Sequence, residues 1–238
     1  YKPNNAVLSI AGDFDPDEAM ALAERYFGNI AGGEVPAYEP PAIQAQTAER
    51  TEVMTDRLAN LPAFHIAYHI PPMRERDHYA LEMLGLILGD GDSSRLYQEL
   101  VKEKEILTSL SVSTDDRRGP DLFSFWGLMA SGHEPAEART AIYEALEKVA
   151  QEGVTERELQ KARNRIRAYF IFGLQSNLSR AQQLAEYELY WGDAEHIREE
   201  VGAYLAVTAD DVKRVAGQYF AATNRTVLDV LPVEGGEQ

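Results

Sequence analysis

Residues 89–100 lie between two apolar helical patterns, and the fold is best approached from this stretch. It reads Gly89-Asp-Gly-Asp-Ser-Ser-Arg-Leu-Tyr-Gln-Glu-Leu100. Glycine costs about 1 kcal/mol inside a helix, so this run is expected to end the helix before it. Asp92 or Ser93 can then accept hydrogen bonds from free backbone N–H groups and begin the next helix. The stretch therefore predicts a capped turn between two helices.

Three sharper interpretations of the same stretch fail on spacing. The third glycine of a dinucleotide-binding fingerprint is missing. A calcium loop that began at Asp90 would need glycine where Arg95 stands and glutamate where Val101 stands. Ser93 as a serine nucleophile would need small residues after it, but Ser94 and Arg95 follow. The turn remains the favoured interpretation.

The stretch also resembles a signature of the insulinase-like zinc metallopeptidases, which include pitrilysin and the mitochondrial processing peptidase. Two other segments resemble this family in the same order: the start Tyr1-Lys-Pro-Asn-Asn-Ala-Val-Leu and the helix start Gly153-Val-Thr-Glu-Arg-Glu-Leu. The resemblance implies tandem homologous domains of α+β class. Each would have a mostly antiparallel sheet with helices packed on one face.

Composition limits the function of the chain. A net charge of −16 argues against nucleic acid and anionic membrane surfaces as partners. The absence of cysteine excludes disulfides and thiolate zinc sites. No apolar run approaches the roughly 20 residues that span a bilayer. Tyr1 is not a natural start, so we expect the chain to be a piece of a longer protein.

Hydrophobic periodicity predicts the elements along the chain. Strands are expected at residues 6–11, 51–55, 63–70, 108–114, 122–130 and 226–231, with 108–114 and 122–130 forming an antiparallel hairpin. Helices are expected at residues 15–28, 77–88, 135–151 and 208–220. A longer helical region should run from Thr155 towards Trp191, with interruptions at Gly173 and Ser176. The first helix is expected to present an inner apolar stripe from Ala19 to Phe27.

An internal echo suggests the domain organisation. Residues 220–228 align with residues 1–8: each has an aromatic residue, an asparagine four positions later and then an apolar strand. With the family resemblance, the predicted division has three parts. Residues 1–28 provide the last strand of a preceding homologous domain plus a helix, 29–50 form a linker, and 51–238 form a non-catalytic insulinase-like domain.

No catalytic or metal-binding residue is predicted in this chain. The family binds zinc through His-x-x-Glu-His, and none of the five histidines falls in that pattern or its reverse. His65 and His69 lie on a predicted strand, where four residues span about 13 Å and cannot share one zinc ion. They are expected on one sheet face with ordinary partners. His78, His133 and His196 are expected to be surface or capping residues.

Ser94 and Arg95 are the only candidate substrate-binding residues. Arg95 could clamp a carboxylate with two hydrogen bonds, but pairing with a neighbouring acid is favoured. An Arg and a Tyr that bind substrate in complete family members are replaced here by Val101 and Thr108. The aromatic residues Phe123, Phe125 and Trp126 are expected to pack in the core.

The resemblance thus implies an inactive domain that forms one wall of a peptide-degrading chamber. Zinc would be held by a catalytic domain or subunit, and this chain would hold no cofactor. Its expected partners are that catalytic unit and peptide substrates, in a dimeric assembly. The family implies a periplasmic location, with the cytoplasm left open. The alternative is a degenerate assembly or binding module without proteolysis.

Overall fold

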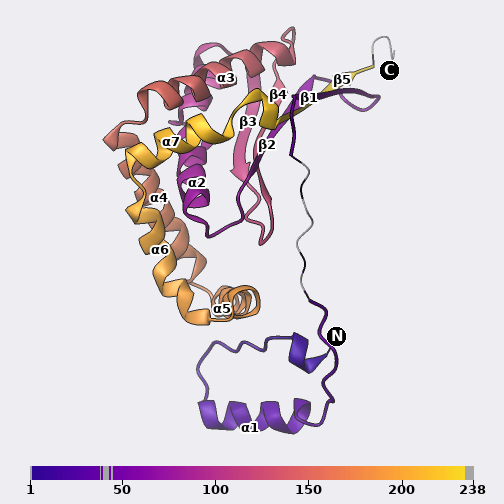
Figure 1. Cartoon of the computed structure of the whole chain (residues 1–238), viewed down its shortest axis with the longest axis vertical. Coiled ribbons are helices and arrows are strands. Elements are labelled where there is room, and N and C mark those ends of the chain that lie inside the picture. The colour runs from indigo at the N-terminus through magenta and orange to yellow at the C-terminus, as the bar shows by residue number, and fades with distance from the viewer. Residues whose placement is uncertain (1, 38, 40–42, 44, 234–238) are drawn as a thin grey trace. The chain divides into compact units, whose positions relative to one another are not determined.

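A five-stranded sheet carries a layer of helices on one face (Figure 1). The computed structural model describes residues 2–37, 39, 43 and 45–233. The strands are β1 (Arg50–Asp56), β2 (Ala63–Ile70), β3 (Leu107–Thr114), β4 (Asp121–Met129) and β5 (Arg225–Pro232). Their order is β1-β5-β2-β4-β3, with β1 and β5 parallel and the other pairs antiparallel. The predicted α+β class is confirmed.

Seven α-helices and four shorter helical turns lie within the described residues. The helices are α1 (Pro16–Phe27), α2 (Arg76–Gly89), α3 (Pro135–Glu152), α4 (Glu156–Gly173), α5 (Asn177–Trp191), α6 (Ile197–Ala206) and α7 (Ala209–Tyr219). The turns are η1 (Pro3–Asn5), η2 (Tyr97–Glu103), η3 (Ala194–His196) and η4 (Ala222–Asn224), of which η2 is π-helical and the others are 3-10 turns. The helix breaks predicted near Gly173 and Ser176 are confirmed by the end of α4 and the start of α5.

Contacts divide the chain into two compact units. One comprises residues 1–40 and 165–203, and the other comprises residues 41–164 and 204–238. The second unit holds the whole sheet together with α2, α3 and α7. The three-part division predicted from the sequence stays a prediction. No helix in the described part of the chain is both long and apolar enough to cross a membrane.

The core of the sheet unit lies between the sheet and its helices. α7 contacts both α2 and α3, and α2 and α7 also contact β3 and β2, respectively. Tyr68, Phe123 and Phe125 are fully buried on the helix-covered face. Phe220 joins them, with its ring centroid 4.9 Å from Tyr68 and 5.0 Å from Phe123. Each such buried side chain contributes about 1.5–3 kcal/mol of transfer free energy.

The stretch at 89–100 ends α2 for a steric reason. A Cβ atom on Gly89 would lie 2.3 Å from Val112 Cγ2, so only glycine lets the helix end approach β3 this closely. Gly91 has φ +74°, a left-handed conformation that favours glycine. The turn is confirmed, but capping by Asp92 or Ser93 was wrong. The Ser93 hydroxyl instead accepts a hydrogen bond from Lys161 Nζ at 2.6 Å.

Two predictions for the N-terminal segment were wrong. Residues 6–11 are extended but join no ladder within the described part of the chain, because a strand requires a neighbour to pair with. α1 begins at its predicted cap, Asp15, yet it buries none of its residues. The large side chains of the expected inner stripe, Leu22, Tyr26 and Phe27, are therefore exposed. Tyr1 of the family signature lies outside the described residues.

Candidate functional site

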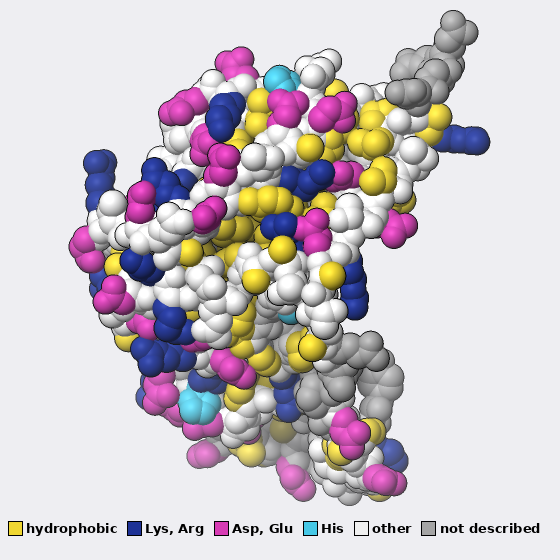
Figure 2. Space-filling model, turned by 45° about the horizontal axis from the view of Figure 1, so that its top comes forward, with side chains coloured by type: hydrophobic (Ala, Val, Ile, Leu, Met, Phe, Trp, Pro, Cys, Tyr) yellow, Lys and Arg dark blue, Asp and Glu magenta, His cyan; other side chains and the backbone are white. Residues whose placement is uncertain are grey.

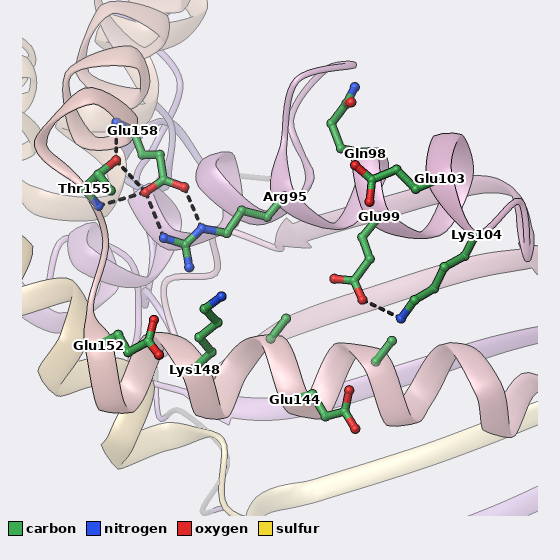
Figure 3. A pocket seen from close by; sticks show the side chains of 12 residues that line it. Arg95, Gln98, Glu99, Glu103, Lys104, Glu144, Lys148, Glu152, Thr155 and Glu158 are labelled. Atoms are coloured by element: carbon green, nitrogen blue, oxygen red, sulfur yellow. Dashed lines mark hydrogen bonds and ion pairs between the residues drawn. The ribbon is translucent and has the colours of Figure 1, made fainter.

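Arg95, one of the two candidate substrate-binding residues, borders a groove in the sheet unit (Figure 3). Its volume is about 710 Å³, and it lies between η2, α3 and the start of α4. Five glutamates and three basic residues line it, a formal excess of two negative charges: Glu99, Glu103, Glu144, Glu152, Glu158, Arg95, Lys104 and Lys148. The groove would attract basic groups more readily than acidic ones.

Arg95 is held by an acid at one end of this groove. Its Nε and Nη2 donate to Glu158 Oε1 and Oε2 at 2.5 and 2.8 Å. Glu158 Oε2 also accepts from the backbone N and the hydroxyl of Thr155 at 2.8 and 2.7 Å, which completes the predicted capping box of α4. These bonds, the one to Arg95 foremost, lower the pKa of Glu158 to about 2. The favoured interpretation, an ion pair with a neighbouring acid, is confirmed.

Ser94 has little capacity for contact with a ligand. The side chain is buried, and its hydroxyl donates to Gly91 O at 2.8 Å within the turn. Two of the five N–H donors of Arg95 are used by Glu158, and Nη2 also donates to Gly153 O at 3.4 Å. Substrate binding by Ser94 and Arg95 stays a prediction, and the geometry favours a role in joining the turn to α4.

The other face of the sheet carries no helix of the sheet unit (Figure 1). We define the open face as the alternate positions of β2, β3, β4 and β5 that point away from α2, α3 and α7. Ser111, Trp126, His65 and Leu228 form one cross-strand row of it. Next to it, the edge strand β1 adds Arg50 and Glu52 beside Thr226 and Leu228 on the same side of the sheet. The residues of the open face itself include no Asp, Glu, Lys or Arg, in a chain of net charge −16. They are Ala63, His65, Ala67, His69, Ser109, Ser111, Ser113, Leu122, Ser124, Trp126, Leu128, Thr226, Leu228 and Val230.

Trp126 lies on an exposed surface that the sequence did not assign. Phe123 and Phe125 pack in the core as predicted, but core packing of Trp126 was wrong, since 43% of the residue is exposed on the open face. The strict alternation of the strand carried this signal. A residue one position from Phe125 must point to the opposite face.

The histidines have three different settings. His65 and His69 share the open face, as expected. His133 and His196 contact Glu137 and Glu199 at helix starts, which fits the predicted surface or capping role. The same prediction for His78 was wrong. His78 is 1% exposed and its Nε2 lies 3.1 Å from Asp121 Oδ2, because the first turn of α2 is covered by the β3–β4 loop.

Charged side chains of both signs lie on the face of the molecule shown in Figure 2. Acidic and basic side chains alternate over the face shown in Figure 2, with hydrophobic side chains exposed between them. Exposed hydrophobic residues include Val53, Met54 and Trp126. A phosphate backbone would need a continuous basic patch. The fold and the missing zinc motif together define a non-catalytic peptidase-like domain.

The chain belongs to the peptidase M16 inactive domain family, whose model matches residues 1–166. It is similar to the zinc protease PqqE of Helicobacter pylori, at 27% identity over 98% of this chain and 52% of that protein. An uncharacterised zinc protease of Mycobacterium leprae is 28% identical over 92% of this chain and 49% of its own length. The chain thus spans about half the length of the curated relatives it matches.

Solved structures agree on the fold. A Helicobacter pylori protease matches with a TM-score of 0.84 at 25% identity, over 93% of this chain and 54% of that chain. A peptidase M16 inactive domain from Pseudomonas fluorescens matches with a TM-score of 0.78 at 15% identity, over 95% of this chain and 54% of that chain. The insulinase-like fold predicted from the sequence is confirmed.

Proposed function

We propose that this inactive domain forms one wall of the peptide-binding chamber of a zinc metalloendopeptidase, with zinc held by a catalytic domain or subunit. The observation that carries the proposal is the open face, where β2, β3, β4 and β5 present no Asp, Glu, Lys or Arg. The chain belongs to a family whose relatives are named zinc proteases, yet it lacks the His-x-x-Glu-His motif. Zinc and the general base would therefore come from the partner unit.

The chemistry of the open face suits peptides of varied sequence. Serines on β3 offer hydroxyl donors and acceptors, and Trp126 offers a broad apolar surface with one N–H donor. Because β2, β3, β4 and β5 present no Asp, Glu, Lys or Arg there, charge selection of a peptide side chain is confined to the edge at β1, where Arg50 and Glu52 lie. A wall of this kind would guide an extended peptide without fixing its sequence. We propose unfolded or extended peptides as the substrates.

The full-length protein that contains this chain provides the test. Its zinc content and peptidase activity would be measured alone and with any neighbouring homologue, beside this 238-residue chain. We expect zinc and cleavage only in the larger assembly. An assembly without zinc and without cleavage would contradict the proposal and leave the alternative, an assembly or binding module without proteolysis.

A pair of variants in the active assembly locates the peptide surface. Trp126→Ala should raise KM for an unfolded peptide several-fold with little change in kcat, because it removes uniform binding. Arg95→Met, on the groove side, should leave KM unchanged. The opposite result would indicate that peptides bind in the groove beside Arg95 and not on the open face.

The compartment and assembly belong to the same proposal. A periplasmic protease of Escherichia coli, PqqL, shares the fold with a TM-score of 0.71 at 16% identity, over 93% of this chain and 25% of that chain. We propose a periplasmic location and a dimeric arrangement of catalytic and inactive units. Cell fractionation and the mass of the purified assembly test the two statements separately.

A further inference from the structure

A buried histidine faces three carboxylates between α2 and the β3–β4 loop. His78 and Glu82 are four residues apart on α2, so they share one face of the helix. Asp116 lies in the loop and Asp121 begins β4. One ligand-capable atom each of His78, Glu82 and Asp116 lies within 4.8 Å of the others.

Two distances from the His78 imidazole suit ligands that share one metal ion. Two ligand atoms about 2.1 Å from a tetrahedral zinc ion lie roughly 3.4 Å apart. His78 Nε2 lies 3.1 Å from Asp121 Oδ2 and 3.6 Å from Asp116 Oδ1, on either side of that value. The Glu82 ligand atom lies within 4.8 Å of those of His78 and Asp116. The imidazole is already aimed at the carboxylates.

The carboxylates are oriented by hydrogen bonds from outside the cluster. The Tyr204 hydroxyl donates to Glu82 Oε2, and Thr114 Oγ1 donates to Asp116 Oδ1 at 2.9 Å. The backbone N of Leu122 donates to Asp121 Oδ1 at 2.7 Å. Partners of this kind hold metal ligands in place in known sites.

Charge and burial also call for a cation. His78 is 1% exposed and Asp121 is fully buried, while the guanidinium Nε of Arg117 approaches Asp121 Oδ1 only to 3.8 Å. Three carboxylates grouped around one imidazole, with Asp121 among them fully buried, would be stabilised by a bound positive charge.

We propose that His78, Glu82, Asp116 and Asp121 bind one divalent transition-metal ion. A single imidazole nitrogen among carboxylate oxygens suits Zn²⁺ or Mn²⁺ better than the all-oxygen sites typical of Mg²⁺ and Ca²⁺. The ion would fasten α2 to the β3–β4 loop. This site is separate from the zinc ion that the proposed function places on another unit.

Metal titration of the purified 238-residue chain, stripped with EDTA, tests the site. Calorimetry with Zn²⁺ and with Mn²⁺ should show one equivalent bound, and Zn²⁺ should raise the melting temperature. Asp116→Asn and Glu82→Gln should each weaken Zn²⁺ binding at least tenfold. Asp116 is the safer variant for folding, because 54% of its side chain is exposed. Its neighbour provides the control, since Asp115→Asn should change the affinity less than twofold.

Two outcomes would overturn the proposal. One is Zn²⁺ binding that is equal in the unsubstituted chain and in both ligand variants while circular dichroism shows all of them folded. The other is binding of Mg²⁺ or Ca²⁺ in preference to Zn²⁺ and Mn²⁺. NMR of the His78 imidazole gives an independent readout, because its nitrogen shifts should change on Zn²⁺ addition and remain fixed in Asp116→Asn. Peptidase activity plays no part in any of these measurements.

Discussion

Residues 2–10 and 221–229 share a local structure but differ in their surroundings. Each begins with a 3-10 turn, η1 or η4, and continues as an extended segment. In each turn an asparagine N–H donates to the carbonyl three residues earlier at 2.9 Å, and the donors are Asn5 and Asn224. The echo seen in the sequence is thus also an echo in backbone structure.

The two segments differ in strand pairing after the turn. The second becomes β5, which pairs with β1 on one side and β2 on the other. Val227 in β5 is 1% exposed, whereas Leu8, at the matching position of the first segment, is 58% exposed. Local sequence sets the turn and the extended chain, but burial depends on strands that lie elsewhere. An exposed apolar segment next to an unburied α1 supports the proposal that residues 1–28 complete a preceding homologous domain.

The largest expected contrast comes from a charge at the matched positions. Val227→Asp should destabilise the sheet unit by more than about 4 kcal/mol, since it places an unpaired carboxylate in the core. Leu8→Asp should change stability by about 0.5 kcal/mol or less in this chain. Denaturant unfolding followed by circular dichroism compares them. Equal losses would mean that the first segment is packed as firmly as β5.

The asparagines of the two turns give a smaller contrast. Asn224 Nδ2 donates to His69 O and Tyr219 O, both at 2.8 Å, and so ties α7 to β2. Asn224→Ala should cost about 2 kcal/mol, because part-buried carbonyls lose their donor. The Asn5 side chain makes no hydrogen bond in the described part of the chain, so Asn5→Ala should cost about 0.5 kcal/mol or less. A cost for Asn5→Ala as large as that for Asn224→Ala would reject this distinction.

The contribution of the α4 helix start to the stability of the fold should depend on pH. The pKa of Glu158 at the start of α4 falls from its ordinary value of 4.5 to about 2, chiefly through Arg95. A lowered pKa stabilises the fold above the unfolded value, so this contribution should be lost as the pH falls from about 4.5 towards 2. Glu158→Gln should cost about 1–2 kcal/mol at pH 7 and much less near pH 2.

Unfolding curves of this variant between pH 7 and pH 2 measure the effect. Glu144→Gln is the control, because Glu144 lines the same groove without a hydrogen bond or ion pair in the described part of the chain. A Glu158→Gln cost that stays constant with pH would show that the ion pair with Arg95 does not stabilise the fold.

Much of the fold was predictable because its signals are local. Alternation placed β2 at its observed residues, and Thr155 with Glu158 predicted the start of α4 correctly. The errors all depend on distant partners. The strand predicted at residues 6–11 would require a neighbouring strand. The exposure of Trp126 depends on which face of the sheet the helices cover. His78 needed the β3–β4 loop, more than 30 positions away, to become buried beside Asp121.

The candidate site was less predictable than the fold for the same reason. The sequence singled out Arg95 correctly as a residue with an acidic partner, but the partner lies 63 positions away. The uncharged open face is distributed over four strands, and its members become neighbours only through the register of the sheet. No single window of sequence contains such a surface, so a motif search cannot find it.

The smallest expected effect concerns the N-cap of α1, a helix whose stability depends on local sequence because it buries none of its residues. Asp15 Oδ1 accepts from the backbone N of Asp17 and Glu18 at 2.9 and 3.0 Å and caps α1. Asp15→Ala should cost about 1 kcal/mol in α1 alone, because this helix buries none of its residues and depends on its cap. Hydrogen exchange should quicken at the amides of α1 and stay unchanged in β5.

Asp13→Ala is the matched control, since Asp13 precedes the cap and makes no capping bond in the described part of the chain. Unchanged exchange in α1 after Asp15→Ala would mean that packing, and not the cap, holds the helix. The first segment would then be packed in spite of the exposure of Leu8 and α1, and it would not differ from β5 in burial. Faster exchange confined to α1 would show instead that this segment has its local structure in place and still lacks the neighbouring strand that buries β5.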